Sequence, residues 1–261
     1  MNHVFSRHLY LLRQLSSRDL AQRYKGTWGG LLWVAVQPLL MLAVYTVVFG
    51  VIFRPRWVGL DSVWDYALVI FLGKIPYIFL LETVGRAPGL ITGHVSYVKK
   101  LAFPLEVLPW MSHLTAAAVA GISFAVWLLF AIIIRQEFPW QVALMPIVYL
   151  PMFVTLLGAS YFISSLGTYF KDVGQVVQPI LFAMMFLSPV FYPLEMAPRI
   201  MRQIMLLNPL TLPIEQSRGL LLFGAPLDYP YLIAQLLFGF VVLALGYAWF
   251  QRTRDGFAEV L

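Results

Sequence analysis

Five long stretches of the chain contain no aspartate, glutamate, lysine or arginine, and this feature most restricts what the chain can fold into. They cover residues 26–53, 107–134, 138–170, 173–194 and 229–251. Each exceeds the roughly 20 apolar residues that a helix needs to cross about 30 Å of hydrocarbon. Only 11% of the residues are charged, whereas soluble domains have about 25%. These charges cannot solvate a globular surface, so a soluble enzyme of the ordinary kind is excluded.

A sixth apolar stretch, at about residues 66–85, is interrupted by Lys74 and Glu82. We count it as a span because its other residues are apolar over a membrane-crossing length. The sequence thus predicts an all-α integral membrane protein with a single transmembrane domain over residues 1–261. The six transmembrane helices are expected at residues 30–53, 66–85, 108–134, 142–167, 176–193 and 229–250.

The basic residues predict the orientation of these spans. With the N-terminus inside, the inner segments hold Arg7, Arg13, Arg18, Arg23, Lys25, Arg86, Lys99, Lys100, Lys171, Arg252 and Arg254, and the outer segments hold Arg54, Arg56, Arg135, Arg199, Arg202 and Arg218. Positive charge favours the cytoplasmic side, so we expect a multi-pass membrane protein with both termini in the cytoplasm. The net charge of +6 then reflects topology and contact with membrane lipid, and nucleic-acid binding is not expected.

Residues 1–25 are expected to form an N-terminal amphipathic helix at the membrane interface. Within residues 3–15 one side carries Val4, Phe5, Leu9, Leu11, Leu12 and Leu15, and the other carries Arg7, Arg13 and Gln14. This pattern suits an anchor that lies in the interface. The alternative is that its polar face also docks a cytoplasmic partner, and both interpretations stay open.

Residues 194–228, between the fifth and sixth spans, are predicted to form two short helices. They contain the apolar stretches 200–212 and 219–227, each too short to cross a bilayer. Prolines and charged residues separate these stretches, a pattern typical of re-entrant or interfacial helices whose backbone is covered by protein or water. A plain outer loop is the alternative, but a solvated loop does not explain the run of apolar residues after Pro198.

No nucleotide or metal site is predicted on this chain. Its only Gly-Lys pair, Gly73-Lys74, has Leu68 and Ile75 where a phosphate-binding loop requires glycine and a hydroxyl residue. The four histidines lack metal-ligand spacing, and His113 is interpreted as a packing residue. Within a span, a charge is a functional candidate. Lys74 either serves function or extends to the outer surface, whereas we interpret Glu82 as extending to the inner surface near Arg86.

The aromatic content predicts a conduit. Flat rings with polar edges stack against sugars, and a tyrosine hydroxyl that faces lipid would lack a partner. Core packing is the alternative for each of these residues taken alone. The candidates for the conduit lining are Trp33, Tyr45, Lys74, Tyr77, Phe79, Trp127, Tyr149, Tyr161, Phe191 and Tyr192.

Six motifs, in order along nearly the whole chain, resemble the ABC-2-type permeases that export O-antigen and capsular polysaccharide in Gram-negative bacteria. They are Arg18–Thr27 with Gly30 and Trp33, Gln37-Pro38, Phe103–Pro109, Tyr169–Val173, Ser188–Pro193 and Leu207–Thr211. Two positions depart from the family pattern. Lys171-Asp172 stands where Arg-Asp is usual, and Pro76-Tyr77 stands where Pro-Trp is frequent, which bears on the conduit lining.

The resemblance implies a homodimer in the bacterial inner (cytoplasmic) membrane that binds two copies of a separate ATPase subunit and exports a lipid-linked polysaccharide. ATP and magnesium would bind the partner, so this chain would be a transport subunit without a cofactor of its own or catalytic residues. The implied ATPase contacts are Arg18, Asp19, Arg23, Tyr24, Lys99, Lys100, Phe103, Pro104, Lys171 and Asp172. The resemblance also implies an outer gate at about residues 194–223 and in the Ser188–Pro193 motif before them. Its residues would be Pro189, Asn208, Pro209, Glu215 and Arg218.

Two alternatives remain at this point. The same fold could export another cargo, such as teichoic acid, a lipid or a drug. A membrane enzyme acting on lipid-linked sugars is the alternative from another class, and it would need Glu82 or His113 for activity without any ATPase. The lack of a cluster of polar residues in the spans argues against an enzyme.

Overall fold

The computed structural model describes the whole chain except residues 1, 24, 27, 54–61 and 100–102. All regular elements in the described part are helical, as expected. Among the described residues, four helical segments are long and apolar enough to cross a membrane. They contain α3 (Val63–Thr83), α5 (Val107–Arg135), α6 (Met145–Tyr169, preceded by the 3-10 helix η5, Trp140–Leu144) and α10 (Tyr229–Thr253).

Two shorter apolar helices correspond to the first and fifth expected spans. The first comprises η1 (Gly30–Leu32), α2 (Trp33–Tyr45) and η2 (Thr46–Phe53), a π-helix that continues α2. The fifth is α7 (Val173–Phe186), which is about 21 Å long at 1.5 Å per residue. The expectation that this helix extends to residue 193 was wrong, because a turn follows at Leu187 and prolines interrupt residues 189–193.

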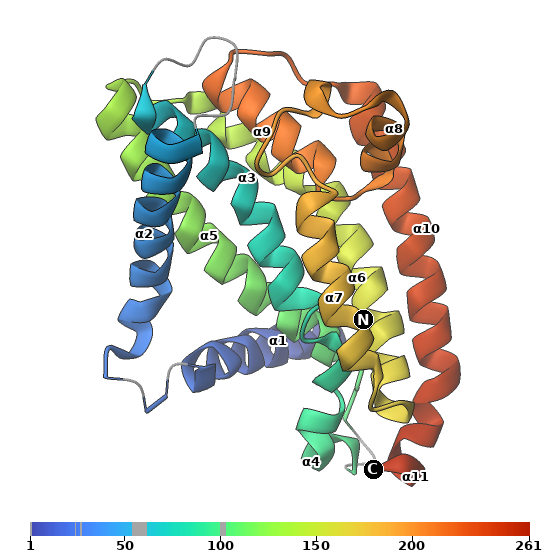
Figure 1. The fold of residues 1–261 in the computed structure, drawn as a ribbon. Helices are drawn as coiled ribbons and strands as arrows, with labels where there is room; N and C mark the ends of the chain where they lie inside the picture. Colours follow the sequence, from blue (N-terminus) through green and yellow to red (C-terminus); the bar gives the residue numbers. More distant parts are fainter. Residues whose placement is uncertain (1, 24, 27, 54–61, 100–102) are drawn as a thin grey trace.

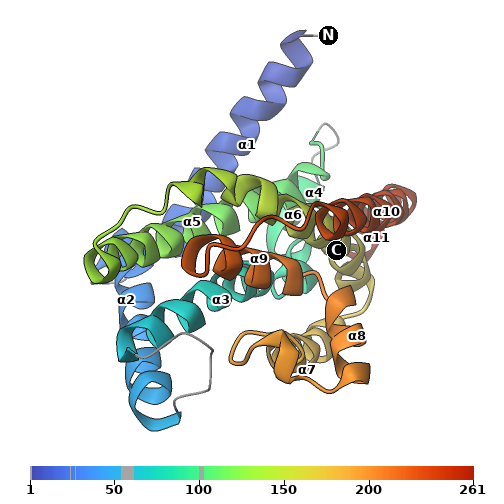
Figure 2. The same cartoon turned by 90° about the horizontal axis from the view of Figure 1, so that it is seen from above.

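The N-terminal helix α1 (Asn2–Arg23) lies across one end of the bundle (Figure 1), which we call the inner end after the expected orientation. Small elements gather at the same end: η3 (Ala87–Gly89), η4 (Thr92–His94), α4 (Val95–Val98), η7 (Arg254–Gly256) and α11 (Phe257–Val260). Viewed along the bundle, α1 projects beyond the other helices (Figure 2). It is fixed to α5, because the Thr115 hydroxyl donates a hydrogen bond to the Ser16 carbonyl at 3.3 Å.

At the opposite, outer end lie η6 (Leu194–Met196), α8 (Arg199–Leu207) and α9 (Thr211–Leu222). Two short helices are therefore present, but their division differs from the expected stretches 200–212 and 219–227. The chain turns at residues 208–210, because Pro209 cannot continue α8, and residues 223–228 are not helical.

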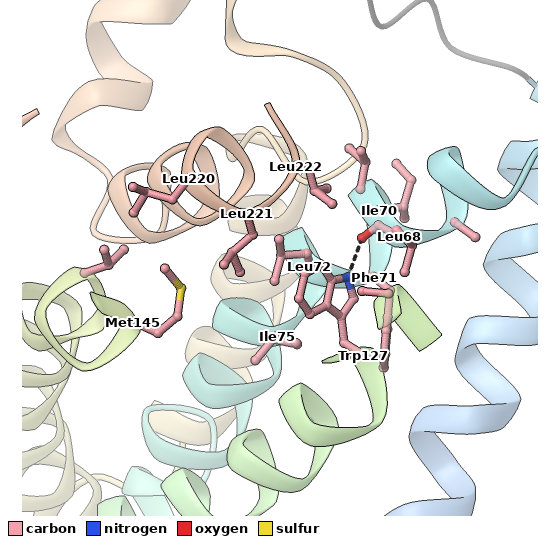
Figure 3. Close-up of a cluster of buried hydrophobic side chains, with 14 of the residues drawn as sticks. Leu68, Ile70, Phe71, Leu72, Ile75, Trp127, Met145, Leu220, Leu221 and Leu222 are labelled. Carbon is pink, nitrogen blue, oxygen red and sulfur yellow. Dashed lines mark hydrogen bonds between the residues drawn. The ribbon is translucent and has the colours of Figure 1, made fainter. Parts of the chain in front are cut away.

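The helix α9 packs into the core of the outer end. Figure 3 shows its Leu220, Leu221 and Leu222 beside α3, around the fully buried ring of Trp127 from α5. The indole nitrogen donates a hydrogen bond to the Leu68 carbonyl at 2.9 Å. Because α9 is buried on this side, it is part of the folded bundle and not a solvated outer loop.

Close packing of α6 against α10 depends on glycines. The carbonyl oxygen of Gly158 lies only 2.1 Å from where a Cβ atom on Gly246 would be. A Cβ atom on Gly158 would likewise lie 2.5 Å from backbone atoms of Leu243. Small residues allow membrane helices to approach this closely, so these two positions fix the distance between α6 and α10.

Candidate functional site

An ion-pair network joins α1 to the inner end of α3. The Arg23 guanidinium lies 2.6 Å from the Asp19 carboxylate and also binds the Glu82 carboxylate. Glu82 contacts Arg86 at 3.3 Å as well, which agrees with the expected i, i+4 pair. The Arg23 side chain is only 9% exposed. Sequence reasoning missed that Arg23 and Glu82 pair, since 59 residues separate them.

Two cavities lie beside this network. One, of about 400 Å³, is lined by Arg23, Arg86 and residues 88–90 among others. The other, of about 240 Å³, lies between α1 and residues 93–97 and includes Arg18. Asp19, His94 and Met111 line both cavities, which therefore adjoin. The structure thus forms a hollow between α1 and the segment that links α3 to α5.

The predicted ATPase contacts differ in accessibility. Arg18, Lys99, Lys171 and Asp172 are exposed and available to a partner, whereas Asp19 and Arg23 already pair within the chain. Phe103 is half-buried and stacks on Tyr97 with ring centroids 4.6 Å apart, next to the half-buried Pro104. Tyr24 and Lys100 lie outside the described residues. For all these positions, contact with an ATPase stays a prediction.

The Arg23–Glu82 pair predicts a measurable contribution to the stability of the chain without any partner. We expect Arg23→Met to lower the free energy of unfolding by about 1 kcal/mol, a modest effect because Glu82 is partly exposed. Glu82→Met should have a similar effect, and the double variant should lose less than the sum of the two single variants, because both remove the Arg23–Glu82 pair. Thermal unfolding of the purified chain measures this, with Arg18→Met, which removes an exposed charge from the same helix, as control. Additive losses in the double variant would contradict a direct pair.

A buried arginine joins three elements at the outer end. Arg218 of α9 is 2% exposed. Its guanidinium donates hydrogen bonds to the carbonyls of Val69 in α3 at 3.0 Å, Pro189 at 2.5 Å and Val190 at 2.6 Å. The same group lies 3.6 Å from the Glu215 carboxylate. Two predicted gate residues, Pro189 and Arg218, are thus in direct contact.

The position of Arg218 explains why residue 73 is a glycine. Sequence reasoning did not assign Gly73 to this region. A Cβ atom on Gly73 would lie 2.1 Å from a guanidinium nitrogen of Arg218. Only glycine leaves room for the guanidinium at this position. The signal in the sequence is a glycine inside a span, which is ambiguous because glycine also serves helix packing.

Asn208 links the last two sequence motifs. Its amide nitrogen donates hydrogen bonds to the Leu187 carbonyl at 3.1 Å and the Ser188 hydroxyl at 2.9 Å. Its side-chain oxygen accepts one from the Leu210 backbone at 3.0 Å, so it also shapes the turn at the half-buried Pro209. The turn after α8 is therefore fixed to the end of α7.

Burial changes the protonation of Glu215 beside Arg218 at the outer end. Burial raises the pKa of Glu215 to about 7, while the neighbouring positive charge of Arg218 opposes this rise.

Arg135 of α5 also connects α3 with α9, because its guanidinium binds the Asp65 carboxylate at 3.0 Å and the Leu222 carbonyl at 2.8 Å. Together, Arg135 and Arg218 hold α9 to α3. The same helix α3 is held to α1 at its inner end.

Two conduit candidates are core residues. Trp127 is fully buried, and Tyr161 is 1% exposed, with its hydroxyl donating to the Glu106 carbonyl at 2.8 Å. Neither ring reaches an open surface of the chain, so their assignment to a conduit lining is corrected to core packing. The physical reason is that neighbouring helices cover the faces on which these rings lie.

The other candidates do not gather at one place. Phe79 and Tyr149 line an apolar cavity of about 470 Å³ between α3, α5 and α6. Trp33 is exposed on α2, and Tyr192 is half-buried, with its hydroxyl bonded to the Phe186 carbonyl at 2.5 Å. The remaining four, Tyr45, Lys74, Tyr77 and Phe191, include a direct contact: the Lys74 amine lies 4.2 Å from the Tyr77 ring centroid and 5.7 Å from that of Phe191.

Lys74 belongs to a narrow open stripe on α3. Between residues 67 and 84, only Lys74, Ile78, Leu81 and Glu82 are not buried. At 3.6 residues per turn these four positions share one face. Both charged residues of the span therefore lie on the one half-buried side of α3, which neighbouring helices cover only in part.

His113 is packed as expected. It is fully buried, and one ring nitrogen lies 3.0 Å from the Pro109 carbonyl. Its ring packs edge-on against Phe79 and Phe153. In the described part of the chain no three histidine or acidic side chains come together as metal ligands.

Residues 10–222 match the family model described as ABC-2 type transporter. The chain belongs to the ABC-2 type transporter family. It is 28% identical to the O-antigen export system permease protein RfbA of Myxococcus xanthus, over 95% of this chain and 94% of the relative. It is also 26% identical to a Klebsiella pneumoniae protein of the same name, over 96% and 95% of the two chains. These relatives are permeases, so this ABC-2 chain is homologous to transport subunits and not to enzymes.

Proposed function

We propose that this chain is the transmembrane subunit of an ATP-driven exporter that moves lipid-linked polysaccharide across the bacterial inner membrane. Membership of the ABC-2 family implies an ABC ATPase as partner. Relatives that match over nearly the full length are named as O-antigen export permeases, which supports a polysaccharide cargo. In this proposal α2 with η2, α3, α5, α6, α7 and α10 form six spans, and both termini are cytoplasmic.

The observation that carries the proposal is the place of Lys74. It lies about 16 Å along α3 from Val63 and about 14 Å from Thr83, near the middle of a bilayer core of about 30 Å. A lysine that faces lipid at this depth costs about 3 kcal/mol. The open stripe on α3 must therefore face protein or water, which favours a passage between two copies of this chain.

The contacts at the two ends of α3 suggest how ATP binding would open the passage. The ATPase would bind the exposed residues at the inner end, near α1 and the hollow beside it. Movement of α1 would reach α3 through Arg23 and Glu82, and then α9 through Arg218. Such a shift requires different contact energies in the two states, which ATP binding on the partner would supply. The helices α8 and α9 would act as the outer gate.

Reconstitution tests this function. The chain is purified with its ABC ATPase partner, and the complex is placed in vesicles with lipid-linked polysaccharide. We expect two copies of each subunit and transfer of the polymer only with ATP, and no transfer with an ATPase variant that binds but does not hydrolyse ATP. Transfer without ATP, or a single copy of this chain in an active complex, would overturn the proposal.

A further inference from the structure

We propose that Lys74 binds an anionic group of the cargo, a phosphate or carboxylate, as the cargo passes through the membrane. This inference rests on the proposed function and names the chemistry that the passage recognises. It concerns the middle of the passage, away from both the ATPase side and the outer gate.

Lys74 has no counter-ion among the residues that the structure describes. It forms no ion pair with any residue that the structure describes, although it sits within a span. An ammonium group has three hydrogen-bond donors. The described residues supply one acceptor, the Met185 sulfur at 2.9 Å. Donors thus remain for an oxygen anion.

The charged residues nearest to Lys74 do not neutralise it. Glu82, the other charge on the open stripe, is paired with Arg23 and Arg86 and lies eight residues along α3, a rise of about 12 Å. Glu215, which belongs to α9, is paired with Arg218. The charge on Lys74 is therefore available to a group that arrives from outside the chain.

Two aromatic rings lie next to the Lys74 amine. The rings of Tyr77 and Phe191 hold it by cation–π contacts, which fix its position without consuming its donors. Aromatic faces next to a cation suit a ligand that carries both sugar rings and anionic groups. In a lipid-linked glycan the anion is either the phosphate ester that joins lipid to sugar or the carboxylate of an acidic sugar.

Binding to the purified chain, without an ATPase, tests the phosphate source. Native mass spectrometry compares a polyprenyl diphosphate with the corresponding polyprenol. We expect wild type to prefer the diphosphate by about tenfold, Lys74→Met to lose this preference and Lys74→Arg to keep it. Arg252→Met, which removes an exposed charge from α10, should behave as wild type.

Export from vesicles tests the carboxylate source. Lys74→Met should slow export of an acidic polysaccharide several-fold more than export of a neutral one if the sugar carboxylates bind. The inference is overturned if Lys74→Met retains the diphosphate preference and slows both polymers equally or neither. Failure of wild type to export with ATP would instead refute the proposed function, and the binding experiment would still report on Lys74.

Discussion

Replacing Gly158 with alanine is expected to lower the free energy of unfolding by about 1–3 kcal/mol, the usual cost of overpacking. The added methyl group would lie 2.5 Å from the backbone of Leu243, which cannot move without displacing α10. Gly246→Ala should act alike, because its methyl group would meet the Gly158 carbonyl. Thermal unfolding in detergent measures the effect, with about 2–4 °C expected for each kcal/mol in a domain of this size.

Gly121→Ala is the matched control. It makes the same substitution within a spanning helix, but its methyl group would meet no atom within 4 Å. It should unfold at or slightly above the temperature of wild type, because alanine favours a helix over glycine. Equal unfolding temperatures for the Gly121 and Gly158 variants would show that α6 and α10 do not pack at the distance described.

Arg218→Met should destabilise the outer end by about 3 kcal/mol. The variant removes hydrogen bonds to three carbonyls and leaves the half-buried Glu215 carboxylate without its partner. Removing one member of a buried pair typically costs more than removing both. Adding Glu215→Leu should therefore restore part of the stability. Thermal unfolding of the purified chain is the measurement.

Two further variants separate this role from a general effect of lost charge. Arg199→Met removes an exposed charge from α8 and should leave the unfolding temperature unchanged. Gly73→Ala keeps the arginine but places a methyl group 2.1 Å from its guanidinium, so it should destabilise in the same direction. Arg218→Met unfolding at the temperature of Arg199→Met would rule out the described contacts.

The sequence by itself determined the class of protein and much of its helical layout. Uncharged runs of membrane-crossing length leave a helix as the available structure, because every backbone group must find its partner within the segment. The interruption by prolines and charges after Pro193 correctly predicted short helices, although Pro209 moved their boundary. The ordered motifs indicated the family that the comparison then established.

Only the tertiary structure decided which residues meet across helices. Periodicity tells which side chains share a face of one helix, but it does not tell which neighbour covers that face. For this reason Trp127 and Tyr161, expected in a conduit, are core residues, and Arg23, expected only at a partner surface, pairs with Glu82. Gly73 and Arg218 lie next to each other although 145 residues separate them in the sequence. The local sequence pattern around either residue does not predict this contact.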